Sequence, residues 1–268
     1  MAALLVLLVI GLLYLLAVRG RTNHPGLDAL RGWSYAHRGL HDAALPENSM
    51  GAFRAALAHG YGIELDIHLM ADGSLAVIHD ASLQRTAGAN VTIESLTTAQ
   101  LANYRLMGTE ETIPLFSDVL ALFDGAAPLI VELKTSGGNA DKLCQAACAM
   151  LDSYHGTYCI ESFDPRCIRW LRKHRPQIIR GQLAENSLHC RVNIPWIIRF
   201  IMTNHLLNFW TRPDFIAYKF PHRKTLGTYL CRKFWGVQGV AWTLRTKEAF
   251  DTAVTEGWIP IFEGFRPK

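Results

Sequence analysis

The sequence predicts an α/β fold built on one parallel sheet, because two kinds of segment alternate along most of the chain. From Pro128 onward, short runs rich in Ile, Leu and Val alternate with longer amphipathic stretches, which is typical of strands joined by helices. The chain has 268 residues, half of them hydrophobic, and an eight-stranded α/β barrel needs about 250. One barrel or one doubly wound sheet therefore accounts for the whole domain.

Eight of the expected strands belong to this sheet. We expect them at residues 34–36, 62–70, 129–134, 157–162, 178–183, 214–218, 239–244 and 259–262, with a short returning strand at 74–78 after a turn. Helices are expected near residues 46–59, 97–103, 117–123, 140–154, 165–174, 224–234 and 247–256. Asn48 or Ser49 is the predicted cap of the first helix, and Gly60 ends it. Periodicity alone does not distinguish a closed barrel from an open sheet.

The N-terminal segment is the longest apolar run of the chain. Residues 1–18 contain no charged side chain and are dominated by Leu, Val, Ala and Ile. As a helix they would extend over roughly 27 Å, just enough to cross the hydrocarbon core of a bilayer. We therefore predict a transmembrane anchor over residues 1–18 and a polar linker over 19–33. A cleaved secretory signal is the alternative, but the run has no basic region before it and no convincing A-x-A cleavage site.

The flanking charges and the cysteines indicate a compartment. Arg19 and Arg21 follow the apolar run directly. The positive-inside rule then predicts a single-pass protein of the cell membrane with its domain on the cytoplasmic side. The six cysteines form no C-x-x-C pair and no regular framework, which favours a reducing compartment.

Positive charge gathers in one part of a chain whose net charge is only +4. Residues 161–235 contain 14 Lys and Arg against 4 Asp and Glu, a local net charge of +10. Such a basic region suits anionic membrane lipid. We expect no nucleic-acid partner, because no nucleic-acid motif accompanies the charge.

Residues 184–213 form an insertion that a plain barrel does not need. Its apolar part, residues 194–213, is rich in Trp, Ile and Phe and lies among Arg191, Arg199 and Arg212. It is too short, and too polar in the middle, to span a bilayer. Two interpretations remain open: an interfacial helix lying in the membrane surface, or an ordinary barrel helix packed on the core.

Polar side chains stand at the ends of several apolar runs, where a parallel sheet gathers its functional groups. They are His37, Arg38, Glu64, Asp66, His79, Glu132 and Lys134. Residues two apart on a strand share a face, so Glu64 and Asp66 point the same way, as do Glu132 and Lys134. Adjacent carboxylates repel each other unless a cation lies between them. A hard divalent metal with oxygen ligands is the expected occupant.

This combination of groups suits chemistry on a phosphate ester. Arg and Lys hold phosphoryl oxygens, a metal offsets negative charge, and two imidazoles move protons. We expect His37 and His79 to be catalytic, and Arg38 and Lys134 to contact phosphate. Trp242 ends a later strand and is expected to line the substrate pocket.

An ordered set of motifs resembles the glycerophosphodiester phosphodiesterase family. The motifs are HRG at residues 37–39, PENS at 46–49, ELD at 64–66, DG-x5-HD at 72–80 and VELK at 131–134, and the similarity extends over residues 34–265. The resemblance implies a (β/α)8 TIM barrel over residues 34–268, preceded here by one N-terminal transmembrane helix, as in a membrane-anchored bacterial-type member. One departure is that many members end in Thr-Asp-x-Pro, whereas this chain has IFEGF at 261–265.

The resemblance also implies an activity. It implies hydrolysis of glycerophosphodiesters to sn-glycerol 3-phosphate and an alcohol, in phospholipid and glycerol metabolism, with Ca2+ or Mg2+ bound by Glu64, Asp66 and Glu132. One alternative is a lysophospholipase D acting on membrane lysophospholipids, which the anchor and the insertion favour. An alternative of another class is a catalytically silent protein that binds lipid headgroups. Such a protein is expected to have lost a site residue, and none is missing.

Overall fold

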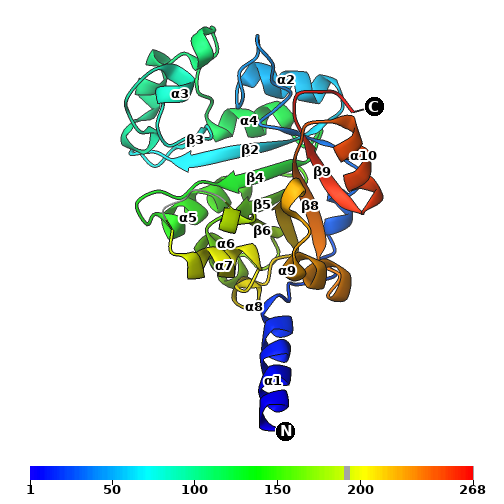
Figure 1. Ribbon diagram of the computed structural model, residues 1–268. Helices are drawn as coiled ribbons and strands as arrows, with labels where there is room; N and C mark the ends of the chain where they lie inside the picture. The colour runs from blue at the N-terminus through cyan, green and yellow to red at the C-terminus, as the bar shows by residue number, and fades with distance from the viewer. Residues whose placement is uncertain (190–193, 268) are drawn as a thin grey trace.

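A closed barrel of parallel strands forms the body of the molecule (Figure 1). The computed structural model describes residues 1–189 and 194–267. Within these residues, the eight barrel strands are β1 (Tyr35–His37), β2 (Gly62–Leu69), β4 (Leu129–Leu133), β5 (Tyr158–Ser162), β6 (Arg180–Ala184), β7 (Phe215–Lys219), β8 (Gln238–Leu244) and β9 (Trp258–Phe262). β1 pairs in parallel with both β2 and β9, which closes the sheet. The predicted TIM barrel is therefore confirmed, and a doubly wound open sheet is excluded.

Helices surround the barrel between successive strands. They are α2 (Met50–Ala58), α3 (Gln84–Ala87), α4 (Phe116–Phe123), α5 (Ala140–Leu151), α6 (Pro165–His174), α7 (Trp196–Thr203), α8 (Asn208–Thr211), α9 (Leu226–Tyr229) and α10 (Lys247–Thr255). The helix predicted near 97–103 is a 3-10 helix, Thr98–Asn103, and the one predicted near 224–234 continues from α9 into a π-helical turn, Leu230–Phe234. Ser49 caps α2 by accepting a hydrogen bond from Ala52 N, as expected. The antiparallel strand β3 (Leu75–Val77) pairs with β2.

Alternation along the strands separates the outer core from the barrel interior. Ile63, Leu65 and Ile67 of β2 join the large cluster beneath the helices. The residues between them face inward, because side chains alternate across a strand. Towards the N-terminal ends of the strands the inward positions are apolar, as at Ile130 and Val240. Towards the C-terminal ends they are polar, so the barrel interior changes from an apolar core to a polar opening, which is called the mouth below.

The segment between α1 and β1 closes the N-terminal end of the barrel. Leu27 and Leu30 are buried in the interior cluster. Arg21 forms an ion pair with the buried carboxylate of Asp214 just before β7. The same carboxylate accepts a hydrogen bond from Arg180 N at 3.0 Å. These contacts fix the N-terminal segment to the start of β6 and β7.

The predicted membrane-spanning helix is not found. α1 (Ala2–Ala17) has 16 residues and so extends about 24 Å, less than the roughly 30 Å of a hydrocarbon core. Among the described residues, no helix is both long and apolar enough to cross a membrane. The helix ends sooner than predicted because its last turn belongs to the domain: Val18 is buried beside Ile216 and Val237, and Leu15 O accepts a hydrogen bond from Trp235 Nε1 at 2.8 Å.

The rest of α1 extends away from the barrel, with only its C-terminal end near α8 (Figure 1). None of its residues is buried, although nearly all are apolar. Its Tyr14 hydroxyl donates a hydrogen bond to Asn204 Oδ1 at 3.0 Å, just after α7. The exposed apolar helix is therefore held at its base by the insertion.

The insertion packs with its polar side chains inward and several apolar side chains outward. Thr203, His205, Asn208 and Thr211 are buried. In contrast, the large hydrophobic side chains with substantial exposure in this segment are Leu188, Ile194, Trp196, Ile197, Ile198 and Phe209. A helix that covers a barrel in water normally shows the opposite pattern. The segment covers the barrel and also presents an apolar surface, so its position in a membrane interface stays a prediction.

Replacing Asp214 tests how firmly the N-terminal segment is fixed. Asp214→Ala removes the partner of Arg21 and leaves Arg180 N without its acceptor, so we expect a loss of about 2 to 4 kcal/mol in the free energy of unfolding. Asp251→Ala breaks an exposed ion pair with Lys247, and we expect a loss below about 0.5 kcal/mol. Urea unfolding followed by circular dichroism measures both. Equal losses would show that the buried pair is not a fixing point.

Candidate active site

The polar mouth of the barrel is a cleft at the C-terminal ends of the strands. In TIM barrels this face holds the reactive groups. The cleft brings together most residues that the sequence singled out, from strands far apart in the chain. It is lined by His37, Arg38, Glu64, His79, Glu132, Lys134, Glu161, Phe163, Leu183, Trp242 and Ile261.

Three buried carboxylates form the centre of the cleft. Glu64 and Asp66 lie on β2, and the pairing of β2 with β4 places Glu132 directly beside Asp66. One oxygen from each of the three residues lies within 4.8 Å of the others. All three are at most 6% exposed. The predicted ligand set is therefore assembled as a compact group of hard oxygen donors.

Burial and mutual repulsion disfavour the ionised forms of these three carboxylates, and the nearby cations offset this only in part. Burial and the neighbouring Asp66 and Glu132 raise the pKa of Glu64 well above its usual range. Burial, only partly opposed by Lys134, raises the pKa of Glu132 to about 7. For Asp66, burial opposes ionisation, but Lys134 and other cationic neighbours lower its pKa. A divalent cation would relieve this repulsion, so the donor set fits one.

Lys134 and Asn48 hold the carboxylates from the side. Lys134 Nζ lies 2.7 Å from Glu132 Oε1 and 3.1 Å from Asp66 Oδ1. Asn48 Nδ2 donates a hydrogen bond to Asp66 Oδ2 at 2.8 Å. The PENS motif at 46–49 thus supplies both a helix cap and a contact to the acidic centre.

Arg38 reaches the same centre through an unusual backbone turn. Its φ of 56° is left-handed, a conformation that is uncommon outside glycine. Arg38 N donates a hydrogen bond to Glu64 Oε2 at 3.2 Å, and its Nη1 donates to Glu47 Oε1 at 2.8 Å. Its Nε is buried and lies 3.5 Å from Asp66 Oδ2, but it makes no hydrogen bond in the described part of the chain. A phosphoryl oxygen would satisfy such a donor.

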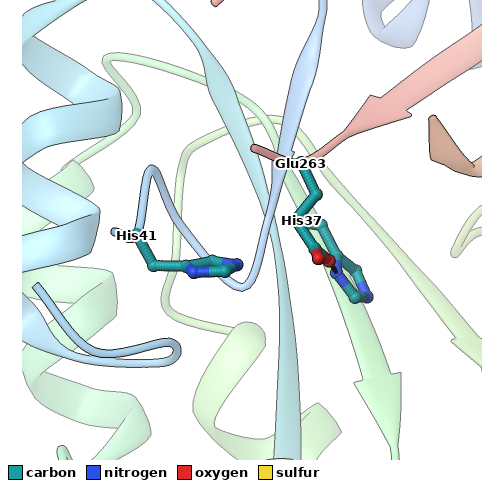
Figure 2. Close-up of side chains that lie close together, drawn as sticks. All are labelled: His37, His41 and Glu263. Carbon is teal, nitrogen blue, oxygen red and sulfur yellow. Dashed lines mark hydrogen bonds and ion pairs between the residues drawn. The ribbon is translucent and has the colours of Figure 1, made fainter. Parts of the chain in front are cut away.

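His37 is held between the acidic centre and the last strand. Its Nδ1 lies 2.5 Å from Glu263 Oε2, and its Nε2 lies 3.8 Å from Glu64 Oε2. Figure 2 shows the Glu263 carboxylate against the His37 ring, with His41 facing them from the loop after β1. Arg245 in turn pairs with Glu263 Oε1 at 2.8 Å. Burial alone would raise the pKa of Glu263, but these two partners lower it to about 2.

His79 is oriented by a neighbouring carboxylate in the same manner. Its Nδ1 lies 2.6 Å from Asp80 Oδ1, and Arg85 links Asp80 to Glu47. Asp80 is not among the site residues expected from the sequence, yet the structure places it as the partner of the imidazole. Burial lowers the pKa of both His37 and His79, although the adjacent carboxylates oppose this shift.

Two acidic residues of the mouth were not predicted. Glu161 lies on β5 beside Glu132 and is 1% exposed. Burial and the charges of Glu132 and Asp66 raise its pKa well above the usual range. Glu263 was passed over as a departure from the family pattern. Each follows or ends an apolar strand at an inward position, so the rule that found Glu132 could have found both.

Aromatic side chains form one wall of the cleft. Trp242 and Phe163 pack edge to face, with ring centroids 5.7 Å apart. Phe163 is 38% exposed, which suits a surface that meets ligand. The expected pocket-lining position of Trp242 agrees with this geometry.

Comparison with known families assigns the chain to one of them. A model described as the glycerophosphoryl diester phosphodiesterase family matches residues 37–262. The chain belongs to this family. The expectation of a phosphodiesterase enzyme is thereby confirmed, and the match covers both histidines and all three predicted metal ligands.

The curated relatives are named either glycerophosphodiester phosphodiesterase or lysophospholipase D. A glycerophosphodiester phosphodiesterase of Caldanaerobacter subterraneus subsp. tengcongensis is 27% identical over 83% of this chain and 89% of the relative. One of Bacillus altitudinis is 40% identical over 38% of this chain and 45% of the relative. A lysophospholipase D of Rattus norvegicus is 31% identical over 44% of this chain and 40% of the relative. The matched region thus covers less than half of the last two relatives.

Solved structures support the fold. A phosphodiesterase of Oleispira antarctica, in complex with the product sn-glycerol-3-phosphate, superposes with a TM-score of 0.73 and 20% identity, covering 91% of this chain and 95% of that one. A glycerophosphodiester phosphodiesterase of Thermotoga maritima has a TM-score of 0.66 and 21% identity, covering 86% and 93%. At these identities the likeness concerns the barrel architecture.

The placement of the two imidazoles generates a direct test. His37→Ala and His79→Ala should each lower turnover of a glycerophosphodiester by about 10² or more, as expected on losing a general acid or base. Neither side chain is part of the apolar core, so circular dichroism and the thermal midpoint should stay near those of the wild type.

The control is His155→Ala, because His155 is exposed on a distant loop. It should leave turnover unchanged. Activity within a few-fold of the wild type in either of the first two variants contradicts a proton-transfer role for that histidine.

Proposed function

We propose that this chain hydrolyses glycerophosphodiesters to sn-glycerol 3-phosphate and an alcohol, in phospholipid and glycerol metabolism, with one bound divalent cation. The observation that carries this proposal is the cleft itself, where three buried carboxylates, two oriented imidazoles and two cationic side chains meet. Membership of the phosphodiesterase family agrees with it.

The cation is Ca2+ or Mg2+, held by Glu64, Asp66 and Glu132. These carboxylates supply the hard oxygen donors that both ions prefer. When bound, the cation would polarise a phosphoryl oxygen and lower the pKa of the attacking hydroxyl or water. The remaining chemistry belongs to the side chains around it.

His37 and His79 share the proton transfers. Each has its Nδ1 against a carboxylate, Glu263 or Asp80, which fixes the ring so that Nε2 is the nitrogen available to substrate. One imidazole takes a proton from the nucleophile, and the other donates one to the leaving alcohol. Arg38 and Lys134 bind the phosphoryl oxygens. Trp242 and Phe163 pack against the alcohol.

Removal of one metal ligand tests the assignment of the acidic centre. Glu132→Gln keeps the shape of the side chain but removes a negative charge, so we expect at least tenfold weaker binding of Ca2+ or Mg2+, by analogy with the roughly 10–100-fold effects seen around metal sites. Titration calorimetry measures the affinity. Chelation should also stop the wild-type enzyme.

Glu248→Gln, on the exposed face of α10, is the matched control and should bind the cation like the wild type. Purified protein that stays fully active in excess chelator, and contains no metal by elemental analysis, would overturn the metal-dependent mechanism.

A second substrate class is favoured by the surface beside the barrel. We propose that the protein binds a membrane surface and also acts as a lysophospholipase D. The support is the outward apolar surface of α7 and α8, together with the exposed apolar length of α1. The names of the rat and mouse relatives agree with a lysophospholipid substrate.

Charge complementarity favours an anionic bilayer as the partner of this surface. Between Glu185 and Glu248 the sequence holds ten Lys and Arg and one acid, Asp214, which is paired with Arg21. Four of the ten pair with acids outside this span: Lys219, Arg223, Arg245 and Lys247. Arg19 lies over the Trp235 ring at the base of α1, 4.7 Å from its centroid. Trp and Arg side chains beside an apolar helix suit the headgroup region. In this arrangement α1 inserts into the acyl region and α7 lies along the interface.

The side of the membrane remains a prediction from the sequence. We propose the cytoplasmic leaflet of the cell membrane, because the cysteines Cys144, Cys148, Cys159, Cys167 and Cys231 are free and buried, as is typical of a reducing compartment. Arg21 is engaged by Asp214, so Arg19 is the flanking residue that remains for headgroups.

A double variant on α7 tests the membrane surface. Trp196→Ser with Ile198→Ser removes exposed apolar area without changing charge, so binding of the full chain to anionic vesicles should weaken at fixed salt. Turnover of a lysophospholipid presented in those vesicles should fall more than turnover of soluble glycerophosphocholine. Vesicle flotation and parallel activity assays measure the two effects.

The control pair is Met107→Ser with Val254→Ser, which removes comparably exposed apolar side chains from other faces of the domain. It should leave vesicle binding unchanged. Equal loss on both substrates in the α7 variant would identify α7 as ordinary barrel packing.

A further inference from the structure

A second group of metal-ligating side chains lies behind the catalytic His37. His37, His41 and Glu263 each place one donor atom within 4.8 Å of the others, and Figure 2 shows the two rings and the carboxylate converging. Nε2 of His41 is buried and has no hydrogen-bond partner in the described part of the chain. An unsatisfied imidazole nitrogen beside another imidazole and a carboxylate is an unusual arrangement unless a ligand meets it.

This group has an entry of its own. A cavity of about 280 Å³ is lined by Leu40, His41, Asp42, Glu263, Gly264, Phe265 and Arg266. The catalytic cleft instead contacts His37, His79 and the carboxylates of β2 and β4. An ion in this cavity would meet His41 and Glu263 directly, whereas His37 is the member of the group that lines the catalytic cleft.

The two groups differ in the cations that they favour. Three carboxylates suit Ca2+ or Mg2+, whereas two imidazoles and one carboxylate suit Zn2+. We propose that His37, His41 and Glu263 form an inhibitory zinc site behind the catalytic histidine. A water completes the tetrahedral coordination that zinc prefers with three protein ligands.

Zinc at this position blocks proton transfer. In the resting enzyme the ring donates its Nδ1 proton to Glu263, which leaves the Nε2 lone pair free. Zinc binds Nδ1 in place of that proton, and the proton moves by way of solvent to Nε2, so the ring stays neutral and no net proton is released. Such a nitrogen cannot accept a proton from the nucleophile.

The required movement is small. The His37 nitrogen and the Glu263 oxygen are 2.5 Å apart, and tetrahedral zinc with ordinary bond lengths would hold them roughly 3.3 Å apart. Glu263 can keep its contact to Arg245 during this change, because Arg245 pairs with the other carboxylate oxygen. This inference rests on the proposed role of His37 for its effect on activity, but not for zinc binding itself.

The experiment compares zinc inhibition of the wild type and of a His41 variant in saturating Mg2+. Zinc should lower turnover of glycerophosphocholine in the wild type by about 10² at saturation, as on losing a catalytic base. His41→Ala should keep its basal turnover, and the zinc concentration for half-inhibition should rise by roughly tenfold or more. His41→Gln provides a second variant in case the loop does not tolerate Ala, and His155→Ala should be inhibited like the wild type.

Titration calorimetry gives a readout that does not depend on activity. Mg2+-saturated wild type should bind one zinc ion that the His41 variants do not bind. The Glu132→Gln variant should still bind this zinc, even if its turnover is lost, so failure of the proposed function and failure of the zinc site are distinguishable. Equal half-inhibition in wild type and both His41 variants, or the same zinc stoichiometry in them, overturns the proposal.

Discussion

The concentration of negative charge inside the barrel mouth is the constraint on which the site depends. Glu64, Asp66, Glu132 and Glu161 are buried within one end of a small barrel, where unpaired charge is costly. Lys134 is the cation in direct ion-pair contact with two of them, and Arg38 approaches Asp66 less closely. The fold tolerates this charge because the strands are held from outside by a continuous apolar cluster. A divalent cation would offset that excess, and together with Arg38 and Lys134 it would favour the binding of an anionic phosphate ester.

The active-site residues and the N-terminal segment lie at different ends of the barrel. The reactive side chains occupy the C-terminal ends of the strands, whereas α1 and the segment after it meet the barrel near the start of β6 and β7. Between these two ends lies the insertion, which buries polar side chains and exposes apolar ones. The surface attachment proposed above would therefore draw on residues other than those of the active site, so a variant can alter one without altering the other.

Much of this arrangement could be predicted from the sequence, because the strands are short apolar runs bounded by clear turns. The predicted strands agree with the structure within about two residues. The acid-x-acid spacing on β2 placed Glu64 and Asp66 on one face correctly. The sequence could not show how deeply each side chain is buried or which residues it contacts. Glu161 and Glu263 belong to the mouth because of strand register, and Asp80 is a partner of His79 because of the ring's orientation. The sequence predicted a longer helix than α1, because hydropathy does not reveal that Val18 is buried by tertiary contacts.

The contact between His37 and Glu263 has a consequence for how the protein becomes active during synthesis. The two residues lie on the first and last strands of the barrel and are 226 positions apart. The imidazole therefore gains its orienting carboxylate only after translation is nearly complete and β9 has docked between β8 and β1. A nascent or prematurely terminated chain would hold the acidic centre without a correctly aligned histidine. Pairing of the first strand with the last is therefore the step that completes the surroundings of His37.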